Sequence, residues 1–157
     1  MKCPFCNPDR GSVLYEGKLV RILLDGYPAS RGHLLVVPKR HVESWDEIRW
    51  EEKEALLRGI ELAMKALKDS LKPDGFNVGI NLGEAAGQTV PHLHVHVIPR
   101  WKGDCKSPRG GVRKAVLDLE DENLSMKERW ERNRLNGNEI QKLKHHFDKL
   151  INAMRDV

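Results

Sequence analysis

The stretch from residue 92 to residue 98 constrains this chain more than any other, because histidines alternate there with aliphatic residues. It reads His92-Leu93-His94-Val95-His96-Val97-Ile98. Strict alternation is the pattern of a β-strand with one buried face, and residues two apart in a strand point to the same side. We therefore expect a strand over 92–99, with three imidazoles on one face and three aliphatic side chains, Leu93, Val95 and Val97, in the core.

Three imidazoles on one strand face bring no evident stability, so the pattern indicates chemistry rather than packing. A neutral imidazole is a nucleophile and a metal ligand. A glycine-rich loop, residues 83–89, precedes the strand, and its backbone N–H groups with the side chains of Gln88 and Thr89 can hold phosphate oxygens. A basic segment with six Lys and Arg residues lies at 99–114. Together these features predict phosphoryl or nucleotidyl transfer. The alternative is that the histidines occur by chance on an exposed polar face of the strand.

The remaining pattern mixes strands and helices. Short strands are expected at 12–15, 19–24, 32–38 and 76–81. Ser44 and Glu47 have capping-box spacing, and an apolar helical stripe that includes Leu56 and Leu57 runs from there to Leu71. A second capping box at Ser125 and Glu128 and an amphipathic helix over 140–154 are expected in the tail. Strands, a long helix, further strands and a helical tail indicate the α+β class.

Composition limits the cellular setting and the kind of partner. The chain has 157 residues and a net charge of +4, which fits a single domain over 1–157 and argues against nucleic acid as the partner. Apolar runs such as 34–37 are far shorter than the roughly 18 residues that a membrane span needs, and the N-terminus does not resemble a signal peptide. Three cysteines do not suggest a disulfide framework, so we expect a cytoplasmic, thiol-reducing location.

The segment from Asn81 to Arg100 resembles the signature of the histidine triad (HIT) family. Residues 32–42 resemble that family's upstream strand, and Cys3-Pro4-Phe5-Cys6 matches many members. The resemblance covers a core of residues 2–115 and leaves 116–157 as a C-terminal extension with helices. It implies a HIT-like fold, in which a long helix crosses a sheet of about five antiparallel strands, and a homodimer that pairs two such sheets.

The resemblance also implies chemistry at the α-phosphate of a nucleotide. His94, the middle histidine, would attack the α-phosphorus and form a nucleotidyl-histidine intermediate, which water resolves. His96 would hydrogen-bond the α-phosphate and the leaving group. By the same resemblance, Asp25 would bind the ribose and His33 would help order the triad. Gln88 and Thr89 would hold phosphate oxygens, and Asn81 would support them.

The basic segment resembles a loop of the fragile-histidine-triad-like branch of the family. There the loop lies near the distal phosphates of the substrate. Arg109 and Arg113 would then form a polyphosphate clamp, to which the planar guanidinium group is well suited. The alternative is a solvated loop without a specific role.

Cys3 and Cys6 have the C-x₂-C spacing of a zinc site, which needs two further ligands. His41 and His92 are the candidates. The zinc-carrying branch of the HIT family resembles this chain at all four positions, and this implies a structural Zn²⁺ that four protein ligands close off from substrate. Two free, partly buried thiols are the alternative.

Taken together, the sequence predicts an enzyme that cleaves dinucleoside polyphosphates, such as diadenosine tri- or tetraphosphate, and releases AMP. A purine nucleotide is the expected ligand. Other readings remain open: an adenosine phosphoramidase, a dinucleoside polyphosphate phosphorylase, or a non-catalytic, zinc-stabilised nucleotide-binding module. Removal of adenylate from nucleic-acid 5′ ends is disfavoured by the modest net charge.

Overall fold

The computed structural model describes residues 2–116 and, after them, residues 125, 131, 136–138, 140–141 and 145. The chain forms two compact units, Met1–Lys114 and Ala115–Val157. In the second unit Glu131 and His145 are helical, and the Ile140 N–H donates to the Asn136 carbonyl oxygen at 3.0 Å. The expected capping box at Ser125 and Glu128 and most of the expected helix over 140–154 lie outside the described residues.

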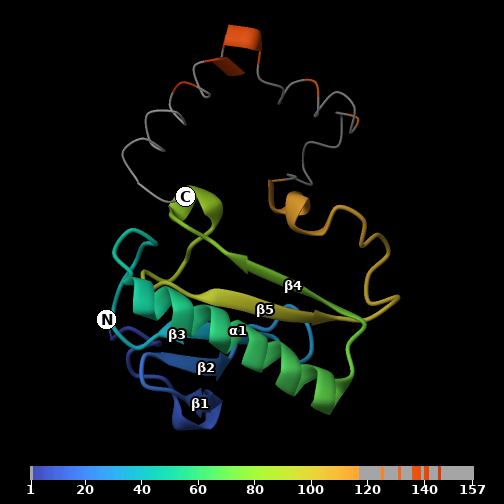
Figure 1. Cartoon of the computed structure of the whole chain (residues 1–157). Helices are drawn as coiled ribbons and strands as arrows, with labels where there is room; N and C mark the ends of the chain where they lie inside the picture. Colours follow the sequence, from blue (N-terminus) through green and yellow to red (C-terminus); the bar gives the residue numbers. More distant parts are fainter. Residues whose placement is uncertain are drawn as a thin grey trace. The chain divides into compact units, whose positions relative to one another are not determined.

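The first unit is built on one antiparallel sheet of five strands, as the sequence predicted (Figure 1). The spatial order of the strands is β1-β2-β3-β5-β4, with antiparallel pairing between all neighbours. The strands are β1 (Val13–Glu16), β2 (Val20–Leu24), β3 (Leu34–Pro38), β4 (Gly75–Ile80) and β5 (Val95–Arg100), with short 3-10 turns at Arg10–Ser12, Glu84–Ala86 and Gly111–Val116.

A single long helix, α1 (Trp50–Leu71), crosses the sheet. It begins at Trp50 rather than near Ser44, because the Ser44 hydroxyl donates to the Glu47 carboxylate instead of capping a first turn. Glu52 performs the capping role by accepting from the Arg49 backbone N–H at 3.2 Å. The helix ends where Lys72 turns into the left-handed region at φ 53°. No described helix is both long enough and apolar enough to span a membrane.

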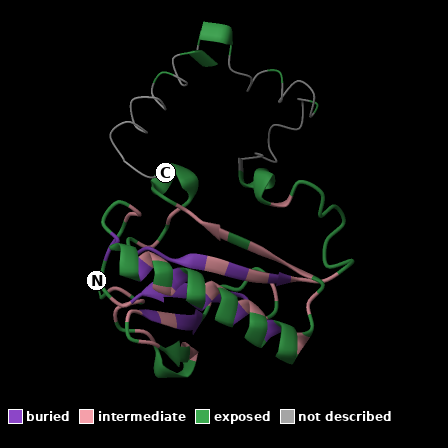
Figure 2. Ribbon diagram, in the orientation of Figure 1, coloured by how far each residue is buried: buried purple, intermediate pink, exposed green. Residues whose placement is uncertain are grey.

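The main core lies between α1 and the inner strands. Figure 2 shows the buried residues along these strands and on the inward side of the helix. The expected aliphatic residues of the histidine stretch are all in this core, together with Leu56 and Leu67 of the helix. Leu57, which we expected on the same stripe, is 62% exposed, because it lies one helical step away from the sheet.

Gly59 allows the helix to approach β3 closely. A Cβ atom at this position would lie 2.7 Å from Cγ1 of Val36, which is closer than two carbon atoms can pack. Val36 is fully buried, and its β-branched side chain has little rotamer freedom. Only glycine therefore fits the contact without a shift of the helix.

The opposite face of the sheet carries a smaller cluster of Leu23, Leu35 and Val37, and Phe5 and Val13 pack against it. Phe5 also lies against the rings of His92 and His94. The N-terminal segment therefore covers part of the face toward which the histidines point.

Strand β5 begins at Val95, so His92 and His94 lie in the segment just before it rather than in the expected strand. Pairing with β3 runs only from Leu34 opposite Val97 to Val36 opposite Val95. Pro38 at the end of β3 has no N–H to donate, and its carbonyl oxygen instead accepts from Nε2 of His92 at 2.8 Å. A side-chain hydrogen bond thus replaces the strand ladder at this point.

We expect Gly59→Ala to lower the free energy of unfolding by up to about 2 kcal/mol, because overpacking against Val36, which costs about 1–3 kcal/mol, outweighs the roughly 1 kcal/mol gained in helix propensity. Urea unfolding measures the change. Adding Val36→Ala in the same chain provides space for the new methyl group, so the two substitutions together should cost less than the sum of their separate effects. Additive effects would contradict the close contact.

Candidate functional site

His94 is held in one tautomer by a backbone carbonyl. Its Nδ1 lies 2.8 Å from the carbonyl oxygen of His92, and because a carbonyl only accepts, Nδ1 must carry the proton of the neutral ring. The lone pair is therefore on Nε2. The side chain is 5% exposed, with the Phe5 ring centroid 5.1 Å away. This is the form of imidazole that acts as a nucleophile.

His96 ends a hydrogen-bond chain that starts at the backbone of Ala29. The Ala29 N–H donates to Nδ1 of His33 at 2.9 Å, so neutral His33 carries its proton on Nε2. That Nε2 lies 2.9 Å from Nδ1 of His96 and donates to it, which leaves the proton of neutral His96 on Nε2. Side chains 63 residues apart in the sequence thus share one defined proton arrangement.

The Nε2 atom of His96 is the only buried side-chain nitrogen or oxygen without a hydrogen-bond partner in the described part of the chain. An unsatisfied buried donor costs about 1–3 kcal/mol. The ring centroids of His94 and His96 are 4.9 Å apart. A ligand atom that accepts from His96 would therefore lie close to the ring of His94.

Burial favours the neutral forms of His33, His92 and His96. Desolvation lowers the pKa of His33 and of His96, and the negative charge of Asp25 acts in the opposite direction on both. Burial also lowers the pKa of His92, partly offset by its bond to the Pro38 carbonyl. Neutral rings at pH 7 agree with the tautomers that the hydrogen bonds define.

Two groups of side chains have the spacing of a metal site, and their protons distinguish them. In the first group, Asp25 Oδ2 lies 3.3 Å from His33 Nε2 and 3.9 Å from His96 Nδ1. Coordination there would need the lone pair of His33 Nε2, yet the Ala29 N–H already uses the lone pair of the other ring nitrogen. This group is therefore a hydrogen-bond network rather than a metal site.

The second group, Cys3, Cys6, His41 and His92, fits a metal. His92 donates its Nε2 proton to Pro38, so its Nδ1 lone pair is free, and this atom lies 3.3 and 3.5 Å from the two sulfurs. Nδ1 of His41 is 3.4 Å from Cys6 Sγ. Tetrahedral Zn²⁺ at about 2.3 Å from sulfur and 2.0 Å from nitrogen separates such atoms by about 3.6 Å. The donor set and its spacing thus match the predicted zinc ligands.

Arg21 of β2 fastens the loop that carries the two cysteines. Its Nη1 donates to the carbonyl oxygens of Phe5 and Cys6 at 3.1 and 3.4 Å. Its Nε donates to Glu16 at 2.7 Å, and Glu16 also pairs with Lys39 at 2.9 Å. The strand thereby holds in place both Cys6, a candidate metal ligand, and Phe5, whose ring lies against His94.

The glycine-rich loop is braced by the side chain of Gln88. Its Oε1 accepts from the Gly83 N–H at 2.8 Å, and its Nε2 donates to the carbonyl oxygens of Glu43 and Val90. A contact between this amide and phosphate would require one of these bonds to break. The side chains of Asn81 and Thr89 make no such bonds within the described residues, so their predicted roles in phosphate binding need no rearrangement.

A hollow of about 520 Å³ lies along β5 and β4; no described histidine lines it, but Ala29, whose N–H bonds His33, does. Ile98, two residues after His96 on β5, lines it, as do Ala29, Arg31 and Asn77. Gly111 of the basic loop approaches Asn77, since a Cβ there would be 3.3 Å from its Nδ2. The basic loop with Arg109 and Arg113 therefore reaches the strand that borders this hollow.

Arg100 also lines the hollow, but its guanidinium is already used. It donates twice to Asp104 at 2.7 Å and once to Asn77 at 2.7 Å. The ion pair holds the pKa of the Asp104 carboxyl well below its usual range. Arg100 thus shapes the hollow, and the other arginine that lines it, Arg31, is exposed.

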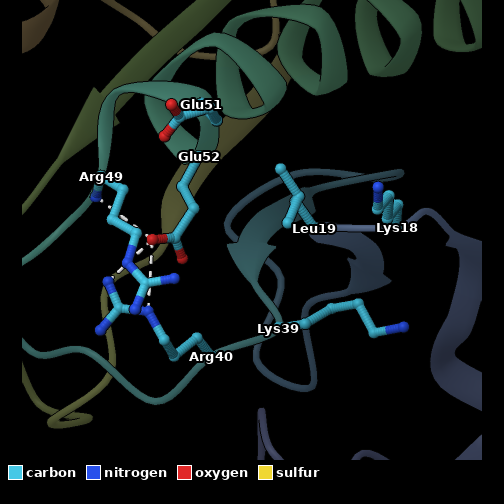
Figure 3. Close-up of a pocket in the computed structure, with 7 residues that line it drawn as sticks. All are labelled: Lys18, Leu19, Lys39, Arg40, Arg49, Glu51 and Glu52. Atoms are coloured by element: carbon cyan, nitrogen blue, oxygen red, sulfur yellow. Dashed lines mark hydrogen bonds and ion pairs between the residues drawn. The ribbon is translucent and has the colours of Figure 1, made fainter.

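A further hollow, of about 450 Å³, opens beside the start of α1 (Figure 3). Glu52 lies in it with Arg40, and their atoms approach to 2.7 Å. Lys39, which also lines it, pairs with Glu16. No residue of the histidine network lines this hollow, so we assign it no part in the chemistry.

The chain belongs to the histidine triad family: the HIT domain family matches residues 9–103. It is 43% identical over 102 residues to an AP-4-A phosphorylase of Mycobacterium tuberculosis, covering 64% of this chain and 52% of that one. It is 35% identical over 124 residues to an adenylylsulfatase of Arabidopsis thaliana, covering 76% and 63%. The chain thus spans about half to two thirds of the length of these relatives.

A solved structure of similar fold is the Zn-bound histidine triad family protein of Mycobacterium smegmatis. Its TM-score is 0.62 at 37% identity, and the alignment covers 68% of this chain and 81% of that chain. A metal-bound relative with this fold agrees with the donor set found here.

Sequence reasoning missed the residues that act through their backbone or through distant partners. Ala29 contributes only an N–H, and the Pro38 carbonyl carries no sequence signal at all. The Arg21 contact with the cysteine loop joins residues 15 and 16 positions apart and has no motif. Phe5 could have been noticed, because an aromatic residue stands inside the C-x₂-C motif.

We expect stability to fall as pH falls below about 6.5, because unfolded histidines bind protons there while buried His33 and His96, whose pKa values are lowered, do not. Above that pH this contribution is fully present. Thermal unfolding between pH 8 and pH 5 measures it. The decline should be smaller in a His33→Gln variant; an identical decline would contradict a buried neutral His33.

Proposed function

We propose that this chain is an enzyme that transfers a nucleotidyl group through His94 and hydrolyses dinucleoside polyphosphates, such as diadenosine tri- or tetraphosphate, to release AMP. The observation that carries the proposal is the fixed pair of tautomers: a free lone pair on His94 Nε2 and an unpartnered N–H on His96. A nucleophile and a hydrogen-bond donor then face one reacting phosphate. The phosphorylase and adenylylsulfatase relatives support chemistry at such a centre.

The reaction proceeds in two displacements. His94 Nε2 attacks the α-phosphorus, and the bond to the leaving nucleotide breaks with its electron pair going to the leaving oxygen. His96 donates a hydrogen bond to this oxygen or to a phosphate oxygen. Water then attacks the nucleotidyl-histidine, the P–N bond breaks, and its electron pair returns to His94. Splitting one displacement into two lowers each barrier.

The loop before the histidines binds the transferred phosphate. Asn81 and Thr89 have side chains without partners within the described residues, and the positive φ of Gly83 and of Gly87 shapes the backbone between them. The side chain of Gln88 stabilises the conformation of this loop through three hydrogen bonds. Positioning of this kind supplies most of the catalysis in phosphoryl transfer.

The leaving nucleotide extends into the 520 Å³ hollow along β5 and β4. Arg31 lines this hollow and Gly111 brings the basic loop to its border. Arg109 and Arg113 of this loop supply positive charge to the distal phosphates, where guanidinium groups bind well.

Phosphorolysis is the second candidate, and the phosphorylase relative favours it. Inorganic phosphate then replaces water in the second displacement, and the product is ADP instead of AMP. Reactions with diadenosine tetraphosphate in the presence and absence of phosphate distinguish the two acceptors. Preference for adenosine phosphoramidate would assign the chain to the phosphoramidase branch.

We also propose that Cys3, Cys6, His41 and His92 hold one structural Zn²⁺. Four protein ligands leave no open coordination position, so the metal would stabilise the fold and would not take part in catalysis. It would join the N-terminal segment to the residues that follow β3 and precede β5. The carbonyl of one ligand, His92, also fixes the nucleophile.

A homodimer through β4 is the assembly that we propose. β4 is an edge strand of the sheet, and Val78 on it is 37% exposed. An edge strand offers unpaired backbone groups to a second copy. Light scattering of the purified chain determines its mass in solution.

Replacing His94 with Asn should reduce AMP release from diadenosine polyphosphates at least a thousandfold, about 4 kcal/mol of barrier, because the attacking lone pair is lost. Chromatographic assay of AMP measures it, with His145→Asn, at an exposed position, as the control. If wild type binds nucleotide and neither protein turns it over, the chain is a binding module.

Purified protein should contain about one zinc ion per chain, and Cys6→Ser or His41→Ala should reduce the zinc content and the melting temperature, since metal binding contributes to folding. Elemental analysis and thermal unfolding measure both. Exposed Cys105 provides the control, and Cys105→Ser should retain the metal. Equal metal content in all three variants would rule out the site.

A further inference from the structure

The carboxylate of Asp25 lies between the two histidines of the proton chain. Its Oδ1 accepts from the Tyr27 N–H at 2.7 Å, which holds the side chain in place. Its Oδ2 lies 3.3 Å from His33 Nε2 and 3.9 Å from His96 Nδ1. The side chain is 13% exposed, so water does little to screen its charge.

Without Asp25, His96 could not easily hold a second proton. The added proton would go to Nδ1, which faces the N–H of His33 at 2.9 Å. His33 cannot move its own proton from Nε2 to Nδ1, because Nδ1 already accepts from the Ala29 N–H. Two N–H donors would then point at each other. Oδ2 of Asp25 is within hydrogen-bond distance of His33 Nε2 at 3.3 Å, and at 3.9 Å from His96 Nδ1 its negative charge favours the second proton without a direct hydrogen bond.

We propose that Asp25 is a positioning residue that lets His96 become doubly protonated and so act as an acid toward leaving groups that need a proton. The proposal rests on the proposed function and deepens it. The resemblance alone assigned Asp25 to the ribose, whereas here the carboxylate acts through His96.

The proton balance is complete. Imidazolium His96 gives its Nε2 proton to the leaving atom as the bond to phosphorus breaks, and it keeps its Nδ1 proton, which the negative charge of Asp25 at 3.9 Å stabilises. The free Nε2 lone pair then takes a proton from the attacking water as the bond from phosphorus to His94 breaks. His96 returns to its starting form without any further reactant.

The charges around His96 support this assignment. Burial lowers its pKa most, positive charge on His94 or His33 would lower it further, and Asp25 is the group that raises it. Asp25 comes from the end of β2, His33 from the start of β3 and His94 from the segment before β5. Removing the carboxylate therefore removes the only favourable interaction with a charged His96 among these groups.

The first experiment needs no turnover. Nitrogen-15 NMR of labelled histidines gives the pKa of His96, with its resonance identified by its loss in His96→Gln. Asp25→Asn keeps an oxygen for the Tyr27 N–H, and we expect it to lower the His96 pKa by about one unit or more. Asp46→Asn, at an exposed position, is the control and should change nothing. An unchanged His96 pKa in Asp25→Asn overturns the proposal.

The second experiment compares leaving groups. Ammonia leaving from adenosine 5′-phosphoramidate needs a proton, whereas ADP leaving from diadenosine triphosphate departs as an anion. We expect Asp25→Asn to lower kcat at least tenfold more on the phosphoramidate, and equally for ribose and 3′-deoxyribose substrates. An equal loss on both leaving groups, or a loss that vanishes with 3′-deoxyribose, overturns the proposal. If wild type turns over neither compound, the proposed function fails, and the NMR result still decides the role of Asp25.

Discussion

The site depends on three backbone groups that fix where imidazole protons lie. The carbonyl oxygens of Pro38 and His92 and the N–H of Ala29 each bond one ring nitrogen. A neutral imidazole in water exchanges between two tautomers, and only one of them is useful at each position here. Because a carbonyl can only accept and an amide N–H can only donate, the fold itself selects the tautomer. The sheet and the helix serve to hold these three groups in place.

The two clusters of metal-ligating residue types show how much a proton decides. Both bring histidines within hydrogen-bond distance of an anionic or thiol partner. In one cluster, a backbone carbonyl accepts from Nε2 of His92, and the lone pair on Nδ1 remains free for a metal. In the other cluster, a backbone N–H donates to Nδ1 of His33, so the proton is on Nε2, the atom that would have to bind a cation. Similar residues thus offer a set of metal-ligating atoms in one place and form a proton network in the other.

The alternation over residues 92–98 predicted the strand, its buried aliphatic side and the sheet around it, because side-chain period is a local property. It did not predict that the ladder stops at Val95, since that depends on Pro38, which is 54 positions from His92 in the sequence. The helix start was misplaced for a related reason: Ser44 and Glu47 bond to each other rather than to backbone amides. The metal-ligand set could be anticipated from the spacing of Cys3 and Cys6 together with the resemblance. The contacts of Arg21, Ala29 and Gln88 with distant or backbone atoms have no sequence pattern.

His92 serves two neighbours through two different parts of itself. Its ring belongs to the group of side chains that could hold a metal, while its main-chain carbonyl accepts from Nδ1 of His94. Every amino acid has that carbonyl, but few have a ring with a free lone pair. Evolution can therefore treat the two duties separately. A descendant that lost the cysteines could exchange His92 for another residue and keep His94 in the same tautomer, provided that other packing retained the backbone path.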